Sequence, residues 1–590
     1  MSRGYVKWAI AQELDGEGDD QDAQAHLRRV DPLLRGIANR RFQSELLSYL
    51  QTDPEDSNGR SILLGMAKEL AVSPTKGPVK APFWWATTLL TALLSSVIGY
   101  LVYAQLTKPA PFSPDEMERV VERPDAYLQG GRPMSLGEEG KELFGKTLPG
   151  FVIALDRHSR KPSEKTKEAL QLAEAVFLAP ANKSLVGAEV YQAMIHLTEA
   201  CHATLLDGEG VSGDVDELNA AFVKQGLSYY IDSDVLTHKL GASPLLYSHF
   251  VEKVRVFRIA PDAVESVYWL RRLDSINYKT NMLGSTHKGA TAAVIRRDLI
   301  NEEVHELLLP ALAKDSDFSL WSPSYRESLP EIQDSLEALS GAKIRADFTT
   351  AGVSESDASE LAGLLSKRDK LFGQLTTRAK ASGYNVAIPT GYRFDMARYR
   401  RLEHIVGKPI LRKLNDIDES LGSEDMAAVY KKVRSAFVTS VEFHELQHRL
   451  DYKRKERIPE VLSRALRPVE DGEALSSYSR RVVTEYSAYM AQIANSDLPF
   501  VVLVLLSKNA FNHKSRSSVY MQAAVAVIES LCSTVEIEHR DFVVNRTIDR
   551  LAIAEAFVQV LALSHEQLRA AAGKAWEEGF ESKLVRPAIQ

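Results

Sequence analysis

The stretch "SVEFHELQHRLDYKR", residues 440–454, places two histidines four positions apart with a glutamate directly after the first. On a helix, residues at i and i+4 share a face, so His444 and His448 can aim imidazole nitrogens at one metal ion. Glu445 projects to another side of that ion, where it can hold a water molecule rather than bind the metal. Apolar residues at helical spacing precede the histidines, which indicates that this face is buried. The pattern therefore predicts a metal-binding helix, with a charged surface helix as the alternative.

A catalytic zinc ion generally has three protein ligands and one water, so a third ligand is expected elsewhere in the chain. The segment "RRVVTEYSAYMAQIA", residues 480–494, has a helical apolar face, and Glu485 lies on it. A carboxylate that is buried without a partner costs several kcal/mol, so a cation is expected beside Glu485. The small Ala488 leaves room for this helix to approach the histidine helix. The alternative partner of Glu485 is an arginine such as Arg480 or Arg481.

These residues resemble the pattern of the gluzincin-type zinc metallopeptidases, which carry HExxH on one helix and a glutamate ligand on a following helix. The matching stretches are "HELQH" at 444–448 and "TEYSAY" at 484–489, with His448 and Glu485 37 positions apart. This spacing is longer than in thermolysin-like and aminopeptidase-like members, and Thr484 stands where an asparagine is often found. The sequence after the second histidine has no third histidine of the metzincin type. The resemblance covers about 50 residues and points to the superfamily pattern, not to one named family.

The resemblance implies a Zn²⁺ cofactor held by His444, His448 and Glu485. Bound zinc would lower the pKa of its water toward about 7 and polarise the scissile carbonyl. Glu445 would accept the proton of the attacking water and pass it to the leaving amine. The expected product is a cleaved amide, formed without a covalent intermediate.

Further site residues are expected around this core. The developing oxyanion needs a donor, and the candidates are Tyr489, His513 and Tyr520, of which Tyr489 and His513 are preferred. Asp451 lies one turn beyond His448 and is predicted to accept the second N–H of that imidazole. The alternative for Asp451 is a salt bridge to a nearby base such as Lys453 or Arg454.

The composition of the 590-residue chain is that of a folded protein with several domains, 45% hydrophobic and 26% charged. A formal net charge of −7 gives no basic field, so nucleic acid is not an expected partner. Two cysteines, Cys201 and Cys532, exclude a disulfide-rich scaffold and a zinc site built from several thiolates. Their pairing is left open.

One uncharged segment predicts a membrane span. Residues 81–107, "APFWWATTLLTALLSSVIGYLVYAQLT", form a 27-residue run, longer than the roughly 20 residues that a helix needs to cross a bilayer. Trp84 and Trp85 lie at one end and Tyr100 and Tyr103 near the other, as expected of rings at the headgroup level. The segment starts too deep in the chain for a cleaved signal and is interpreted as an uncleaved anchor. The apolar run at 498–506 is too short to span and is interpreted as a buried element.

Lysines shortly before the predicted span outnumber the basic residues that follow it, which stand among acidic ones. This bias predicts a single-pass cell-membrane protein with a cytoplasmic N-terminus and a periplasmic or extracellular catalytic domain.

The expected fold class is mostly α with an α+β portion: a single transmembrane helix, then a large outer region ending in a helical zincin-like catalytic domain. β-branched and aromatic runs predict strands between about 226 and 310. Helical patterns predominate elsewhere, and nearly every segment after 395 is expected to be helical. The expected divisions are a mainly helical cytoplasmic segment, the span, a juxtamembrane linker, an α+β outer region and a helical metallopeptidase-like domain, at 1–80, 81–107, 108–135, 136–394 and 395–590.

The favoured function is a membrane-anchored zinc metallopeptidase acting on protein or peptide substrates. One alternative is an envelope scaffold or signalling protein whose zincin-like domain binds metal, or no longer does, and has no hydrolytic activity. Another is hydrolysis of a non-peptide amide, because the motif describes the reaction and not the substrate.

Overall fold

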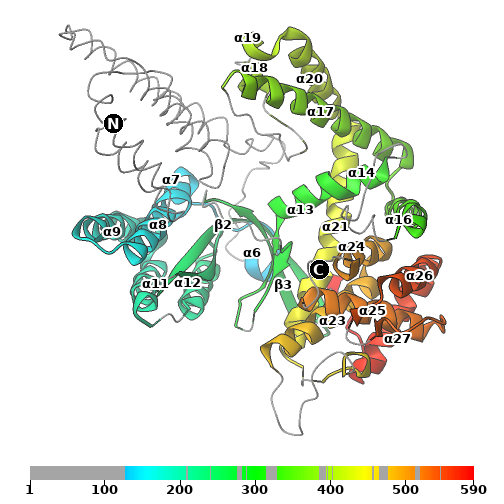
Figure 1. The fold of residues 1–590 in the computed structure, drawn as a ribbon. Helices are drawn as coiled ribbons and strands as arrows, with labels where there is room; N and C mark the ends of the chain where they lie inside the picture. Colours follow the sequence, from blue (N-terminus) through cyan, green and yellow to red (C-terminus); the bar gives the residue numbers. More distant parts are fainter. Residues whose placement is uncertain are drawn as a thin grey trace, which may run out of the picture. The chain divides into compact units, whose positions relative to one another are not determined.

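The computed structural model describes residues 126–590, except for 208–209, 239–240, 275–281, 288, 314–328, 384–391, 393, 395, 401–402, 455–456, 464–475, 512–517 and 545–546. Every described residue belongs to one compact unit, Leu106–Gln590, in which a mixed sheet lies among helices (Figure 1).

The chain first forms a group of helices that packs against the start of the sheet. Ser163 begins the second long helix with a capping box, because its hydroxyl and that of Thr166 each accept a backbone N–H of the other residue. Phe144, Phe151 and Phe222 are fully buried in the core of this group. The elements are α6 (Ala126–Gln129), α7 (Gly137–Glu142), η2 (Leu143–Thr147), α8 (Leu148–Arg160), α9 (Glu164–Phe177), α10 (Pro180–Val186), α11 (Ala188–Asp207) and α12 (Ser212–Lys224).

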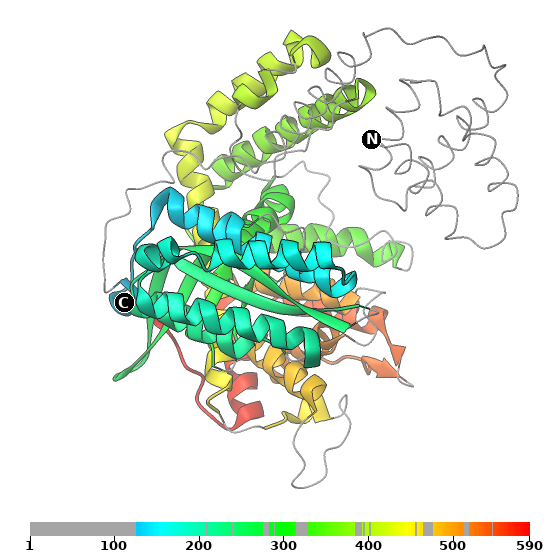
Figure 2. The ribbon, with the colours of Figure 1, turned by 90° about the vertical axis from the view of Figure 1, so that its left-hand side faces the viewer.

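The sheet follows where the sequence predicts strands. Its order is β1-β2-β3-β5-β4, with β3 and β5 parallel and the other neighbours in this order antiparallel. The long β2 has irregular register with β3 at two places, and the C-terminal β8 pairs with its far end. The strands are β1 (Tyr229–His238), β2 (Gly241–Ala260), β3 (Ala263–Arg272), β4 (Gly284–Ser285), β5 (Ala293–Arg296) and β8 (Ala588–Ile589). Figure 2 shows the first helices, coloured blue to teal, in front of these strands.

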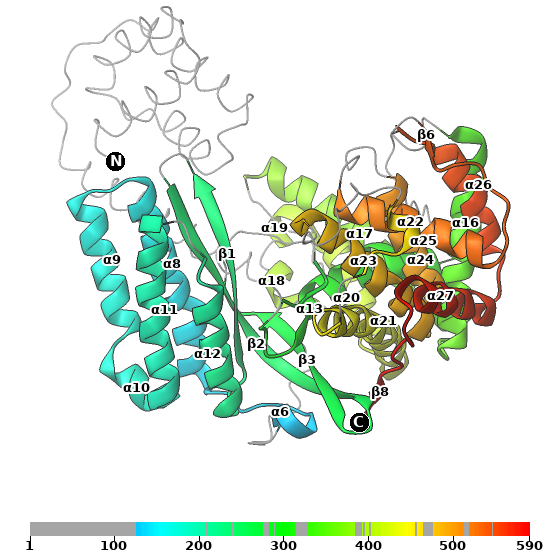
Figure 3. The same cartoon turned by 90° about the horizontal axis from the view of Figure 1, so that it is seen from below.

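Helices make up most of the remaining described chain. Between the sheet and the histidine segment these are α13 (Arg297–Glu303), η3 (Val304–Leu308), α14 (Leu309–Leu312), α16 (Pro330–Thr350), α17 (Glu355–Ala381), α18 (Met396–Arg400), α19 (Glu403–Val406) and α20 (Lys408–Leu421). From the histidine segment onward they are α21 (Glu424–Asp451), α22 (Glu460–Ser463), α23 (Ser477–Asn495), α24 (Pro499–Phe511), α25 (Val519–Thr534), α26 (Arg550–Leu561) and α27 (His565–Phe580), with a small hairpin of β6 (Val543–Val544) and β7 (Thr547–Ile548). Figure 3 shows α21 and the C-terminal helices across the strands from α8, α9, α11 and α12.

One hydrophobic core joins the sheet to these later helices. It contains Phe257 of β2 and Ile295 of β5 together with Phe437 of α21 and Tyr486 of α23, all buried. The described parts of 136–394 and 395–590 are therefore packed into one another. Cys201 and Cys532 are buried and unpaired.

A buried charge fixes α21 to the sheet. The Glu442 side chain is fully buried and accepts hydrogen bonds from Arg255 on β2 and, at 2.7 Å, from Trp269 Nε1 on β3. Burial raises the pKa of Glu442 to about 7, although Arg255 opposes the shift. Since an unpaired buried carboxylate would be costly, this cluster ties the helix to one position on the strands.

The predicted fold class is wrong in its architecture. Within the part of the chain that the structure describes, no helix is long and apolar enough to cross a bilayer. The predicted span at 81–107 lies outside the described residues, as does the whole segment 1–80. One hydrophobic core contains residues of both the strands and the later helices. The apolar run at 498–506 is buried within that core, chiefly as part of α24.

Candidate metal centre

Helix α21 carries both histidines near its C-terminal end. It begins at Ser423, whose hydroxyl accepts the backbone N–H of Met426, and acidic residues occupy its first turn, where the helix dipole favours them. Buried apolar residues such as Phe437 and Val441 hold one side of the helix in the core. His444 and His448 continue that side, with only 12% of each side chain exposed.

Helix α23 packs against α21 and brings Glu485 opposite the two histidines. His444 Nε2 lies 3.1 Å from His448 Nε2 and 3.5 Å from Glu485 Oε2, and His448 Nε2 lies 3.8 Å from Glu485 Oε1. Tetrahedral ligands at 2.0–2.1 Å from zinc are separated by about 3.3–3.4 Å. The three ligand atoms, all within 4.8 Å of one another, therefore fit around one ion with a small adjustment.

The charges of the triad are unequal without a metal. Burial lowers the pKa of His444, but the hydrogen bond and charge of Glu485 outweigh it, so the pKa lies above its ordinary value. Burial lowers the pKa of His448 to about 4. Burial raises the pKa of Glu485, but the two histidines bring it below its usual range. The raised pKa of His444 favours its protonated form beside the anionic Glu485, and the lowered pKa of His448 leaves that imidazole neutral.

Gln492 orients His444, and the sequence reasoning missed it. Its Oε1 lies 3.1 Å from His444 Nδ1, while its Nε2 donates to Ser440 Oγ at 3.1 Å. With Nδ1–H donating to the amide oxygen, Nε2 of His444 is the nitrogen that offers a lone pair to a metal once its proton is displaced. The spacing held a signal: Gln492 follows Glu485 by seven residues on α23, and Ser440 precedes His444 by four on α21.

Glu445 lies beneath the short strand β4. Glu445 is only 5% exposed. Burial raises the pKa of its carboxyl group to about 7; the charge of Glu485 adds to this rise, and the charge of His444 opposes it. A Cβ built on Gly284 of β4 would lie 2.6 Å from Glu445 Cγ and 2.7 Å from Oε1. Only a glycine leaves room for this carboxylate, a constraint that the sequence alone does not reveal.

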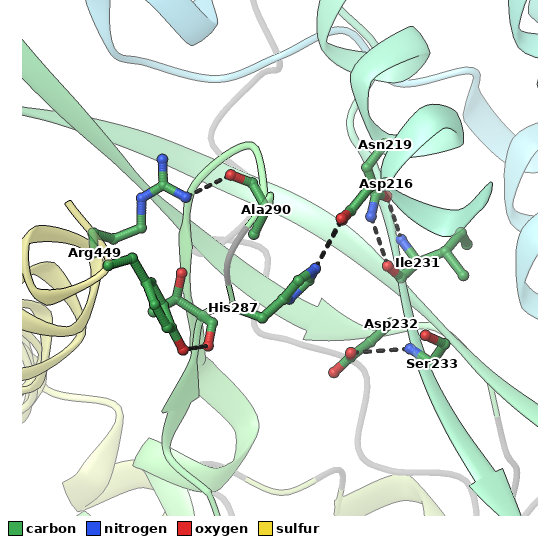
Figure 4. Close-up of polar contacts among 10 residues, drawn as sticks. Asp216, Asn219, Ile231, Asp232, Ser233, His287, Ala290 and Arg449 are labelled. Carbon is green, nitrogen blue, oxygen red and sulfur yellow. Dashed lines mark hydrogen bonds and ion pairs between the residues drawn. The ribbon is translucent and has the colours of Figure 1, made fainter. Parts of the chain in front are cut away.

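Two contacts hold the loop between β4 and β5. His287 Nε2 lies 3.0 Å from both carboxylate oxygens of Asp216 on α12, and Arg449 of α21 donates to the carbonyl of Ala290. Figure 4 shows these two contacts reaching the loop from different elements. The strand above Glu445 is thus tied to the first group of helices and to α21.

Of the three expected oxyanion donors, the structure describes Tyr489 and Tyr520. The Tyr489 ring packs edge-on against His444, with 4.7 Å between the ring centroids. Burial raises the pKa of Tyr489 well above its ordinary value, and Glu485 adds to this, so its hydroxyl stays protonated. Burial raises the pKa of Tyr520 on α25, and the charges of Glu485 and Glu445 add to this rise. His513 lies outside the described residues.

Asp451 faces a different network from the one predicted. Its Oδ1 accepts hydrogen bonds from Gln447 at 2.8 Å and Ser487 at 3.1 Å, and it pairs with Arg454 at 3.0 Å. Trp576 of α27 donates to the same Ser487 hydroxyl at 2.9 Å. The contacts of Asp451 therefore favour the alternative, a salt bridge to a nearby base that joins the end of α21 to α23 and α27.

We expect zinc affinity to depend on the proton of His444. Zinc must displace that proton, so affinity should fall by about tenfold per pH unit once the pH drops below the raised pKa of His444. His448, already neutral there, should add no slope. Competition with a chromophoric chelator between pH 8 and 5.5, corrected for the protonation of the chelator, measures this. An affinity that does not change across this range would contradict the charge assignment.

We expect Gly284→Ala to lower the free energy of unfolding by about 1–3 kcal/mol, because the added Cβ overlaps the Glu445 side chain. In a Glu445→Ala background the overlap disappears, and the same substitution should cost much less. Chemical denaturation of the four proteins gives the coupling directly. Gly373→Ala, where a Cβ meets nothing within 4 Å, serves as the control. Equal costs in both backgrounds would show that β4 does not press on Glu445.

Comparison of the chain with known protein families, with characterised proteins and with solved structures found no match. The functional argument therefore depends on the residues of this site and their geometry.

Proposed function

We propose that this chain is a zinc-dependent hydrolase that cleaves peptide bonds. The observation that supports this most is the convergence of His444, His448 and Glu485 beside a buried Glu445. Two imidazoles and one carboxylate are a donor set that zinc favours in hydrolases, and three protein ligands leave a position for water. The two cysteines are buried elsewhere and supply no thiolate that would suggest another kind of zinc site.

The residues around the triad have the chemistry that amide hydrolysis requires. Zinc, when bound, supplies a Lewis acid that polarises a carbonyl and makes water more acidic. Glu445, with a pKa of about 7 raised by burial, can accept a proton from the attacking water and return it to the leaving amine. Tyr489, whose ring packs against His444 and whose hydroxyl stays protonated, is the favoured donor to the developing oxyanion.

The position of β4 favours an extended peptide as the substrate. It is the last strand at its end of the described sheet, and it lies directly over Glu445. A peptide that pairs with such an edge adds one strand to the sheet through main-chain hydrogen bonds. Such pairing would place a scissile bond beside Glu445 and the metal. A compact non-peptide amide could not pair with the edge of β4 in this way.

The experiment combines metal content with hydrolysis. We expect the purified full chain to hold about one zinc per molecule and to cleave members of a mixed peptide library, with products read by mass spectrometry. Glu445→Gln should keep the zinc and lose about 10²–10⁴-fold in rate, because it removes the base alone. Glu485→Ala should lose most of the zinc. Glu460→Ala, at an exposed position of α22, should change neither zinc content nor rate.

Absence of stoichiometric zinc in the wild-type chain, or full activity of Glu445→Gln, would refute the proposal. Stoichiometric zinc without hydrolysis of any peptide would instead support a metal-binding protein without this activity. If the chain cleaved only amides that are not peptide bonds, the peptide assignment would be rejected and the proposal of zinc-dependent amide hydrolysis would stand.

A further inference from the structure

Arg481 lies one helical turn before the metal ligand Glu485 on α23. Residues at i and i+4 lie on one helix face, with roughly 5–6 Å between their Cβ atoms. Arg481 is exposed, whereas Glu485 has only 14% of its side chain exposed. The guanidinium therefore extends toward solvent from the rim of the metal centre.

Other arginines close to the site are already engaged with carboxylates. The pairs are Arg255–Glu442, Arg296–Asp232, Arg449–Glu265 and Arg454–Asp451. Among the ion pairs of the described residues, Arg481 has no such partner. Its neighbours are the Tyr520 hydroxyl, whose pKa it lowers through a hydrogen bond, and the charge of Glu485.

The two imidazoles of the triad face the Glu485 carboxylate and oppose its charge, as a bound divalent ion would. Arg481 therefore leaves a positive charge at the rim beside the Tyr520 hydroxyl, an arrangement that attracts an anion. A planar guanidinium matches the two oxygens of a carboxylate in particular.

We propose that Arg481, assisted by the Tyr520 hydroxyl, binds a carboxylate of the substrate and makes the site selective for peptides that carry one near the scissile bond. The carboxylate belongs either to an acidic side chain or to a free C-terminus. This inference depends on the proposed function for its peptide substrate, but recognition of the carboxylate is a separate property that binding alone can test.

The experiment uses the zinc-loaded full chain and four fluorescent peptides of one sequence. Two end in a free carboxylate and two in an amide, and within each pair one position holds Glu or Gln. Anisotropy titrations with Glu445→Gln measure binding without turnover, and wild-type hydrolysis of the same peptides is measured separately. We expect at least one carboxylate-bearing peptide to bind about tenfold more tightly than its neutral partner.

In the Arg481→Ala variant, made in the same background, this preference should fall to within about twofold, with zinc content unchanged. Arg481→Lys should restore part of it, and Arg480→Ala, which lies on a different part of the helix face, should leave it intact. The four peptides also identify the source: a preference between Glu and Gln indicates a side chain, and a preference between acid and amide indicates the C-terminus.

Equal binding of all four peptides would overturn the inference. So would a preference that survives Arg481→Ala, since the carboxylate would then be bound by the metal or by another residue. If the preference depends on Arg481 but no peptide is cleaved, carboxylate recognition stands and the proposed hydrolysis fails.

Discussion

The packing of α23 against α21 is the constraint on which the site depends, because it buries a carboxylate between two imidazoles. The hydrogen bond from His444 and the nearby imidazoles keep the pKa of Glu485 below its usual range although the carboxylate is buried. The raised pKa of His444 in turn reflects the charge of Glu485. The packing of the two helices thus holds the candidate metal ligands together in the described structure by ordinary ion pairing.

The opposite side of α21 explains how the site keeps its geometry. Glu442, two residues before His444, is bound by Arg255 and Trp269 of the sheet. The same sheet carries Gly284 over Glu445, and the loop beyond it is held by His287 and Arg449. α21 therefore presents two candidate metal ligands to α23, an anchoring carboxylate to the strands and a candidate base to the edge strand. A small shift of the sheet would therefore move the surroundings of Glu445.

The sequence predicted those parts of the site that follow from helical spacing. The motif at 444–448 and the buried face around Glu485 identified the three residues that the structure brings together. The roles of Gln492 and Gly284 were not predicted, because they depend on contacts between different elements of the chain. Asp451 was assigned by spacing to His448, yet its carboxylate is bound by Gln447, by Ser487 of α23 and by Arg454. The strands were predicted, but their sharing of one core with the later helices was not, because that packing has no local pattern.

The coordination of zinc bound to the full chain tests the central claim most directly. X-ray absorption at the zinc edge reports the number and kind of ligand atoms around the metal. The geometry predicts two imidazole nitrogens and oxygen ligands from Glu485 and water, at about 2.0–2.2 Å. In Glu485→Ala, any zinc that remains should keep the two imidazoles and lose the carboxylate. A sulfur ligand, a single imidazole, or a spectrum unchanged in Glu485→Ala would contradict the assignment of this triad as the metal centre.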